Sequence, residues 1–117
     1  MSTHAIAVVP PTCPISAAGG KSKHKLINQS ALKLAFKIKS SNNSNYGVNP
    51  IFGFVNVGAE VEVEITRKAG KPQADKLVVM YKSVADDVVD AKAVFEAKDA
   101  KPAELDGEVI VKLSAAE

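Results

Sequence analysis

One short stretch restricts the fold of this chain more than any other. Residues 31–39 read Ala-Leu-Lys-Leu-Ala-Phe-Lys-Ile-Lys and alternate with a period of two. Successive side chains of a β-strand point to opposite faces, so this pattern predicts a strand with one buried face and one wet face. The predicted buried set is Leu32, Leu34, Phe36 and Ile38, and the predicted wet set is Lys33, Ala35, Lys37 and Lys39. The Ser/Asn run at residues 40–45 predicts a loop.

Other short runs predict further strands. Short extended pieces lie at residues 5–9, 12–15, 46–50 and 52–55, and longer strands are predicted at residues 23–28, 60–66, 75–82 and 108–113. The first two are expected to be edge pieces broken by prolines, because proline has no N–H to donate. Residues 86–98 show a helical period, with Asp86 and Asp87 placed to complement the helix N-terminus, and Asp106-Gly107 predicts a turn. We therefore expect an all-β antiparallel sandwich of about seven strands, with one short helix before the last strand.

Length and composition limit the class of protein. A chain of 117 residues predicts one domain, residues 1–117. No apolar run is long enough to span a bilayer, and the N-terminus shows no secretory signal, so we expect no direct membrane anchor. Cys13 is the single cysteine and cannot form an internal disulfide. These features favour a cytoplasmic location.

The charge is distributed unevenly along the chain. Residues 1–59 hold six lysines and no acidic residue, whereas residues 60–117 hold nine basic and thirteen acidic residues. The first part therefore carries +6 and the second 9 − 13 = −4, which together give the net charge of +2. Such an asymmetry predicts charged faces that select partners or orient self-association. The alternative is a solvated surface whose charges happen to be segregated.

The sequence offers little support for catalysis. The histidines at positions 4 and 24 have no metal-ligand spacing, Cys13 has no nearby base, and no glycine-rich phosphate loop precedes a helix. His24 is expected to pack at a strand start rather than act as a ligand or base. Glu60, Glu62 and Glu64 alternate on one strand face, whereas catalytic carboxylates need a cleft, so a solvated row is the better interpretation. We expect no enzymatic activity, no metal and no cofactor.

Nucleic acid is not an expected partner either. The lysines of residues 31–39 could contact phosphates, but no arginine accompanies them and Phe36 belongs to the buried set. Proteins that bind single strands combine a basic groove with exposed aromatic side chains, and the second half of this chain is acidic. The expected partners are other proteins or further copies of the chain.

Several motifs resemble those of the major sperm protein domain family. They are Asn28-Gln-Ser, Phe36-Lys-Ile-Lys-Ser-Ser and Tyr46-Gly-Val-Asn-Pro followed by Gly53, with later landmarks at Lys76-Leu-Val-Val and residues 91–95. The resemblance covers about residues 6–114. It implies a seven-stranded immunoglobulin-like sandwich of the PapD type.

Two kinds of protein carry this domain. Nematode major sperm proteins assemble into the filaments that drive sperm crawling, and VAMP-associated membrane proteins bind acidic peptides that contain two phenylalanines. Because the chain shows neither a coiled coil nor a membrane anchor, it is most similar to the small sperm-specific members. The resemblance implies a structural or scaffolding role related to the sperm cytoskeleton. A peptide-binding adaptor is the alternative.

The resemblance also implies a candidate binding face. The residues that match the peptide-binding positions of the second group are Lys37, Lys39, Ser40, Ser41, Lys76 and Val78. In an immunoglobulin-like sandwich the strands at residues 31–39 and 75–82 are neighbours, so their outward lysines would surround an apolar strip of Val78 and Met80. The alternative is a solvated basic sheet without a ligand.

A second hypothesis concerns self-association. The row of Glu60, Glu62 and Glu64 is expected on the outer face of the opposite sheet. A basic face and an acidic face on opposite sides of one molecule would allow copies to pack head to tail, which is the type of contact that forms filaments.

Overall fold

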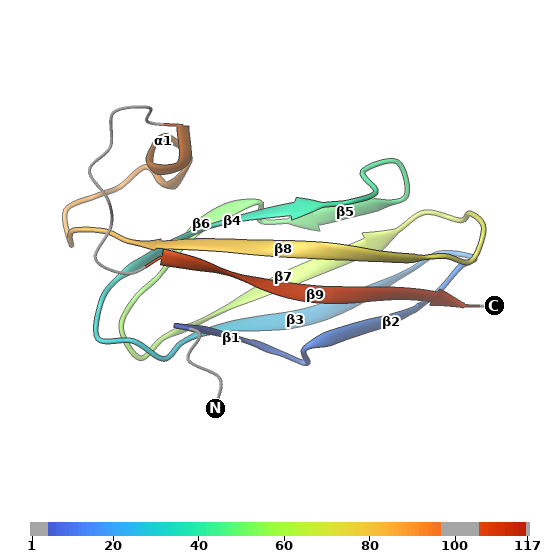
Figure 1. The fold of residues 1–117 in the computed structure, drawn as a ribbon, viewed down its shortest axis with the longest axis horizontal. Coiled ribbons are helices and arrows are strands. Elements are labelled where there is room, and N and C mark those ends of the chain that lie inside the picture. Colours follow the sequence, from blue (N-terminus) through green and yellow to red (C-terminus); the bar gives the residue numbers. More distant parts are fainter. Residues whose placement is uncertain (1–4, 97–105, 117) are drawn as a thin grey trace.

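A computed structural model describes residues 5–96 and 106–116 of the chain. Within these two ranges the backbone forms nine strands and one short helix (Figure 1). The strands are β1 (Ile6–Val9), β2 (Thr12–Ser16), β3 (Gly20–Asn28), β4 (Leu34–Ser40), β5 (Tyr46–Asn49), β6 (Phe52–Val55), β7 (Glu60–Arg67), β8 (Ala74–Ser83) and β9 (Asp106–Ala116). The helix α1 (Ala91–Glu96) precedes β9, as predicted.

The strands form two sheets packed face to face, so the predicted all-β sandwich is confirmed. One sheet has four strands in the order β1-β3-β7-β5, and the other has five in the order β2-β9-β8-β4-β6. Two details of the prediction are wrong. The strand count is nine rather than seven, and β2 pairs with β9 in parallel, whereas the other neighbours pair antiparallel.

Prolines explain the higher strand count. Pro10 and Pro11 separate β1, which pairs with β3 in one sheet, from β2, which pairs with β9 in the other. Pro50 separates β5 from β6, which also lie in different sheets. The peptide bonds before Pro10 and Pro50 are cis. Because proline lacks the N–H of a ladder hydrogen bond, each break lets the chain move from one sheet to the other.

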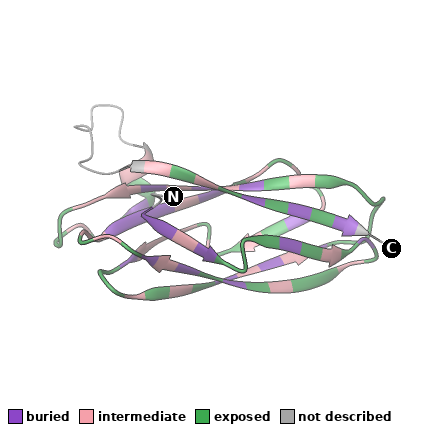
Figure 2. Ribbon diagram, turned by 60° about the horizontal axis from the view of Figure 1, so that its bottom comes forward, coloured by how far each residue is buried: buried purple, intermediate pink, exposed green. Residues whose placement is uncertain are grey.

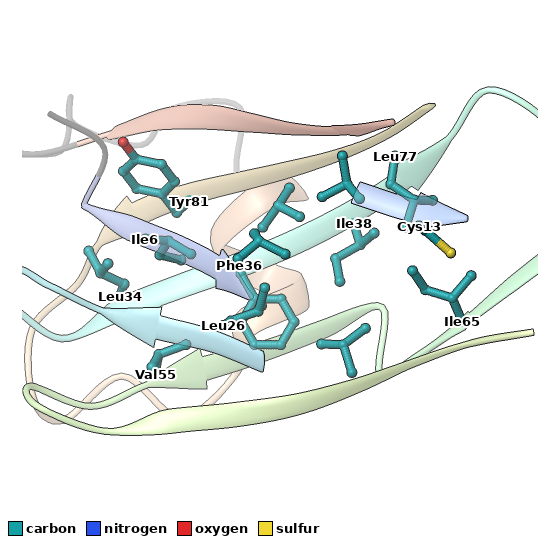
Figure 3. Close-up of a cluster of buried hydrophobic side chains, with 14 of the residues drawn as sticks. Ile6, Cys13, Leu26, Leu34, Phe36, Ile38, Val55, Ile65, Leu77 and Tyr81 are labelled. Carbon is teal, nitrogen blue, oxygen red and sulfur yellow. The ribbon is translucent and has the colours of Figure 1, made fainter. Parts of the chain in front are cut away.

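The core lies between the sheets and follows the alternation along the strands (Figure 2). Leu34, Phe36 and Ile38 of β4 are buried as predicted. They meet inward side chains from both sheets, including Leu26, Val55 and Ile65 (Figure 3). Phe36 lies directly against Gly53, where an added Cβ would be 2.7 Å from the ring. Glycine is therefore required at this position of β6.

Three local predictions are corrected by long-range contacts. The strand that was expected from residue 31 begins at Leu34, because the buried side chain of Asn28 donates to the carbonyl of Leu32 at 2.8 Å and holds the preceding residues in a bend. The helix is capped by Asp90, whose Oδ1 accepts from the N–H of Ala93 at 3.1 Å, and not by Asp86 or Asp87. The predicted helix extends to residues 97 and 98, which lie outside the described residues.

The predicted turn at Asp106-Gly107 is also wrong. Both residues lie at the start of β9, where they pair with Lys82 and Tyr81 of β8. The hydroxyl of Tyr81 would be 2.5 Å from a Cβ added at Gly107, so this glycine serves close packing rather than a turn.

Candidate protein-binding face

The outer face of the five-stranded sheet brings lysines and apolar side chains together. Directly opposite residues of paired strands point to the same side of a sheet. In the register of β4 and β8, Lys37 lies opposite Met80 and Lys39 lies opposite Val78. In the register of β8 and β9, Val78 lies opposite Ile110 and Lys76 lies opposite Lys112. We call this set the basic face: Lys37, Lys39, Lys76, Val78, Met80, Ile110 and Lys112.

Four of the six predicted site residues therefore share one surface. Lys39 and Lys76 are exposed, while Lys37 and Val78 are half-buried. The Nζ of Lys37 lies 5.5 Å from the centre of the Phe52 ring on the neighbouring strand β6. This cation–π contact holds the Lys37 side chain near Phe52, whereas Lys39 and Lys76 remain open to solvent.

Ser40 and Ser41, the other two residues of the candidate binding face, both take part in hydrogen bonds within the chain. The hydroxyl of Ser41 donates to Oδ1 of Asp75 at 3.2 Å and accepts from the N–H of Lys76 at 3.0 Å. The hydroxyl of Ser40 accepts from the N–H of Asn42 at 3.0 Å. These bonds fasten the loop after β4 to the start of β8, beside the basic face.

Asp75 is the centre of this polar cluster. Besides Ser41, the side chains of Asn42 and Gln73 donate to its Oδ2 at 3.2 and 2.7 Å. Desolvation raises the pKa of Asp75, but the hydrogen bonds from Gln73, Asn42 and Ser41, together with the charge of Arg67, outweigh it and lower the pKa below the ordinary value. Asp75 is therefore a carboxylate that organises the loop.

Helix α1 covers one end of the sheet and removes two predicted residues from the open face. Ala35 is completely buried, although it points to the predicted wet side, because α1 packs against β4 and β6 at this end (Figure 1). Lys33 donates to the carbonyls of Val88 at 2.9 Å and Asp86 at 3.3 Å, and its Nζ lies 4.4 Å from the centre of the Phe54 ring. Lys33 thus fixes the segment before α1, through the carbonyls of residues 86 and 88, to the chain just before β4.

A shallow hollow of about 200 Å³ lies between the basic face and α1. Its lining residues are Met80, Tyr81, Lys82, Phe95, Gly107 and Glu108. The Nζ of Lys82 lies 5.6 Å from the centre of the Phe95 ring. The apolar strip of the basic face therefore continues from Val78 through Met80 into a concave, partly aromatic surface.

Ile110 and Lys112 were missed by the sequence analysis. Ile110 is 55% exposed, the largest exposure of a big apolar side chain on this sheet among the described residues. The signal was present in the sequence, since Val109, Val111 and Leu113 alternate as an inward set and this places Ile110 and Lys112 outside. What the pattern lacks is the register that puts them beside Val78 and Lys76.

The opposite sheet does not present the acidic face that the head-to-tail hypothesis requires. Glu60, Glu62 and Glu64 lie on its outer side as predicted, but lysines of β3 form a matching row beside them. The Nζ···Oε1 distances are 3.8 Å for Lys21–Glu64, 3.9 Å for Lys23–Glu62 and 3.0 Å for Lys25–Glu60. Because each glutamate has a lysine next to it, this face is a balanced array of charges, and the charge basis of that hypothesis is lost.

His24 and Cys13 are buried in the core. The Nδ1 of His24 donates to the carbonyl of Pro10 at 2.9 Å, which leaves Nε2 to pair with the hydroxyl of Ser22 at 2.8 Å. Desolvation raises the pKa of the Cys13 thiol, and a hydrogen bond with Ser22 acts in the opposite direction. Residues 5–96 and 106–116 contain no group of three His, Cys, Asp or Glu side chains able to hold a metal ion. The same residues include no helix long and apolar enough to span a membrane.

Comparison with known proteins gives consistent matches. Residues 5–104 match the family described as the MSP (Major sperm protein) domain. Sperm-specific class P protein 16 of Caenorhabditis elegans is 53% identical over 88 residues, which cover 75% of this chain and 81% of that protein. The solved structure of WR4, a C. elegans MSP family member, has a TM-score of 0.87 and 42% identity, covering 96% of this chain and 98% of that one.

The fold is also similar to more distant structures. The ASH/PapD-like domain of human CEP192 has a TM-score of 0.61 at 12% identity, covering 100% of this chain and 91% of that one. At this identity the similarity concerns the fold alone, and it confirms the PapD-like architecture predicted from the sequence.

Proposed function

The chain belongs to the major sperm protein domain family, and we propose that it is a non-enzymatic structural or scaffolding protein of the sperm cytoplasm, associated with the cytoskeleton of that family. The similarity to a sperm-specific class P protein supports the sperm context. The observation that carries the proposal is the basic face, where lysines surround partly exposed apolar side chains on a part of the sheet that α1 leaves uncovered.

The composition of the basic face suits contact with an acidic protein surface. A typical interface has an apolar centre within a polar rim. Here Val78, Met80 and Ile110 form the centre, and lysines of three adjacent strands form the rim. The positive charge repels a second basic face and attracts carboxylates, so the partner is expected to be acidic. Attraction between exposed charges is screened over about 10 Å at 0.1 M salt, so binding should weaken as salt is added.

Binding to filaments tests this proposal. Purified filaments of a nematode major sperm protein are mixed with the wild-type chain at low and moderate salt, and the pelleted fraction is measured. The double variant Lys39→Glu/Lys76→Glu should lose co-sedimentation. The matched control Lys68→Glu/Lys71→Glu changes the net charge equally in the exposed loop between β7 and β8 and should retain it. A wild-type chain that does not co-sediment, or equal behaviour of the two variants, contradicts the proposal.

The second candidate function is an adaptor for acidic peptides with two phenylalanines. The apolar strip and the hollow beside Phe95 support it, since an aromatic side chain can pack against such surfaces. Anisotropy titration with a fluorescent peptide containing four acidic residues and two adjacent phenylalanines measures this directly. Salt-sensitive binding lost in Lys39→Glu/Lys76→Glu but retained in Lys68→Glu/Lys71→Glu supports the adaptor. No binding up to about 1 mM, the weak end of the affinity scale, excludes it.

A further inference from the structure

The outer face of the four-stranded sheet carries two straight rows of opposite charge. Lys21, Lys23 and Lys25 follow one another on alternate positions of β3, and Glu60, Glu62 and Glu64 do so on β7. We call these six residues the charge ladder. Side chains in its three ion pairs are between 36% and 68% exposed, so all of them can reach a second surface.

The register fixes which charges lie at the same level. Lys25 is directly opposite Glu62, and Lys23 is directly opposite Glu64. The ion pairs are diagonal, however, since Lys23 bridges to Glu62 and Lys25 to Glu60. The four central residues of the charge ladder are Lys23, Lys25, Glu62 and Glu64. Each of them forms an ion pair with one residue of the neighbouring strand and lies directly opposite another.

The charge ladder is complementary to itself under one symmetry operation. Consider a two-fold axis that lies in the interface, parallel to the strands and midway between β3 and β7. Rotation about it exchanges the two rows and keeps every residue at its level. The lysine row of one copy then lies over the glutamate row of the other, with Lys25 facing the second copy's Glu62. A two-fold axis across the strands would place lysine over lysine instead.

We propose that a second copy of this chain docks on the charge ladder, face to face, through this two-fold axis. The contact is isologous, since the same surface is used by both copies. The four central charges of the ladder then face opposite charges across the interface in addition to their ion pairs within the sheet, which is more than an isolated surface ion pair provides. The two outer charges, Lys21 and Glu60, lie opposite Thr66 and Ile27 of the second copy. Among the described elements, α1 packs against β4 and β6 of the other sheet and leaves this face uncovered.

The contact extends beyond the proposed function, because it uses neither the basic face nor α1. The two surfaces lie on opposite sides of the sandwich (Figure 1). A dimer formed through the charge ladder would display two basic faces that point away from each other. Variants of one surface leave the other intact, so the two proposals are tested separately.

Two single variants and their mixture distinguish this dimer from a solvated face. Glu62→Lys places like charges opposite Lys25 of the second copy, and Lys25→Glu places like charges opposite Glu62, so each variant alone should dissociate at least about tenfold more easily than the wild type. In an equimolar mixture, the heterodimer brings the two altered positions face to face with opposite charges, and its unaltered Lys25 and Glu62 also face each other. The mixture should therefore recover dimerisation close to that of the wild type.

Lys23→Glu is the matched control. It removes the residue that forms the ion pair with Glu62 within the chain, yet position 23 faces Glu64 of the second copy under the two-fold axis. A mixture of Glu62→Lys with Lys23→Glu keeps like charges at both altered positions and should show no recovery. All substitutions are at exposed positions, and equal thermal midpoints verify that each variant is folded.

Sedimentation velocity over a wide concentration range, at low and high salt, gives the readout. Recovery in the first mixture and none in the second supports the proposed dimer. A wild-type chain that remains monomeric up to about 1 mM at low salt overturns it. Equal recovery in both mixtures, or in neither, also overturns it, and neither result affects binding at the basic face.

Discussion

The hydroxyl of Ser41 and the carboxylate of Asp75 form a hydrogen bond of 3.2 Å that joins the loop after β4 to the start of β8. The same hydroxyl accepts the N–H of Lys76, the residue at one end of the basic face. The loop and the candidate binding surface are thus held by one polar cluster. The protonation state of Asp75 therefore affects the geometry of the loop and of the candidate binding surface.

Acid is expected to weaken the fold through Asp75. Its pKa is lower in the folded chain than the ordinary value of 3.8, so the carboxylate adds stability that is fully present above that value. This contribution is lost as the pH falls through the folded pKa. Asp75→Asn should unfold more easily at neutral pH by about 1 kcal/mol, and the difference from the wild type should shrink in acid. Urea unfolding between pH 2 and 7 measures it, and a difference that is constant over this range contradicts the role of the charge.

Gly53→Ala should destabilise the sandwich. The new Cβ would lie 2.7 Å from two atoms of the Phe36 ring, and Phe36 is fully buried between the sheets. Relief requires movement of a close-packed ring, which costs about 1–3 kcal/mol. Gly47→Ala in β5 is the control, because nothing lies within 4 Å of its added Cβ. Denaturant unfolding should separate the two variants, and an equal effect would show that the contact with Phe36 is unimportant.

Asn28→Ala should also be costly. The buried Asn28 amide donates to the carbonyls of Leu32 at 2.8 Å and Val55 at 2.9 Å. Removing it takes this donor from the buried Val55 carbonyl, whereas the Leu32 carbonyl still accepts from the Ser30 hydroxyl at 3.0 Å. The expected loss is about 1–3 kcal/mol. Asn43→Ala, at an exposed loop position, should stay within about 0.5 kcal/mol of the wild type. Thermal unfolding of both variants provides the comparison, and equal midpoints would contradict the role of the Asn28 amide.

Ile110→Glu should abolish binding at the basic face and leave stability nearly unchanged. The side chain is 55% exposed beside Val78, so the substitution places a negative charge in the centre of the apolar strip at little cost to folding. Val57→Glu is a matched control, since Val57 is 56% exposed and lies outside the three strands of this face. Filament co-sedimentation should be lost in the first variant only. Co-sedimentation of both variants would show that Ile110 does not belong to the binding surface.

The parts of the fold that were predicted correctly depend on local patterns. Alternation identified the inward side chains of β4 and the outward glutamates of β7, because the direction of a side chain in a strand is fixed by its position. The strand breaks at Pro10 and Pro50 were also visible, since proline acts on its own backbone. The number of strands was underestimated because those breaks separate strands that enter different sheets.

The parts that were missed depend on residues far apart in the chain. Ala35 is buried by a helix more than fifty positions later, and no local pattern contains that contact. The lysines of β3 and the glutamates of β7 were each assigned to a strand, but their pairing follows only from the register between the strands. The same holds for Ile110 beside Val78. The sequence therefore predicted to which face of the sheet most side chains point, but not which side chains of other strands lie beside them.

The edge strands have a further consequence for the behaviour of the chain at high concentration. The four strands at the sheet edges, β1, β5, β6 and β2, have only four, four, four and five residues, and Pro14 lies within the last of them. Unpaired backbone at a long, flat edge templates runaway growth of cross-β aggregates. Edges this short, one of them interrupted by Pro14, give a growing aggregate little backbone to extend. Reversible contacts between the side chains of neighbouring copies can then form without competition from irreversible amyloid.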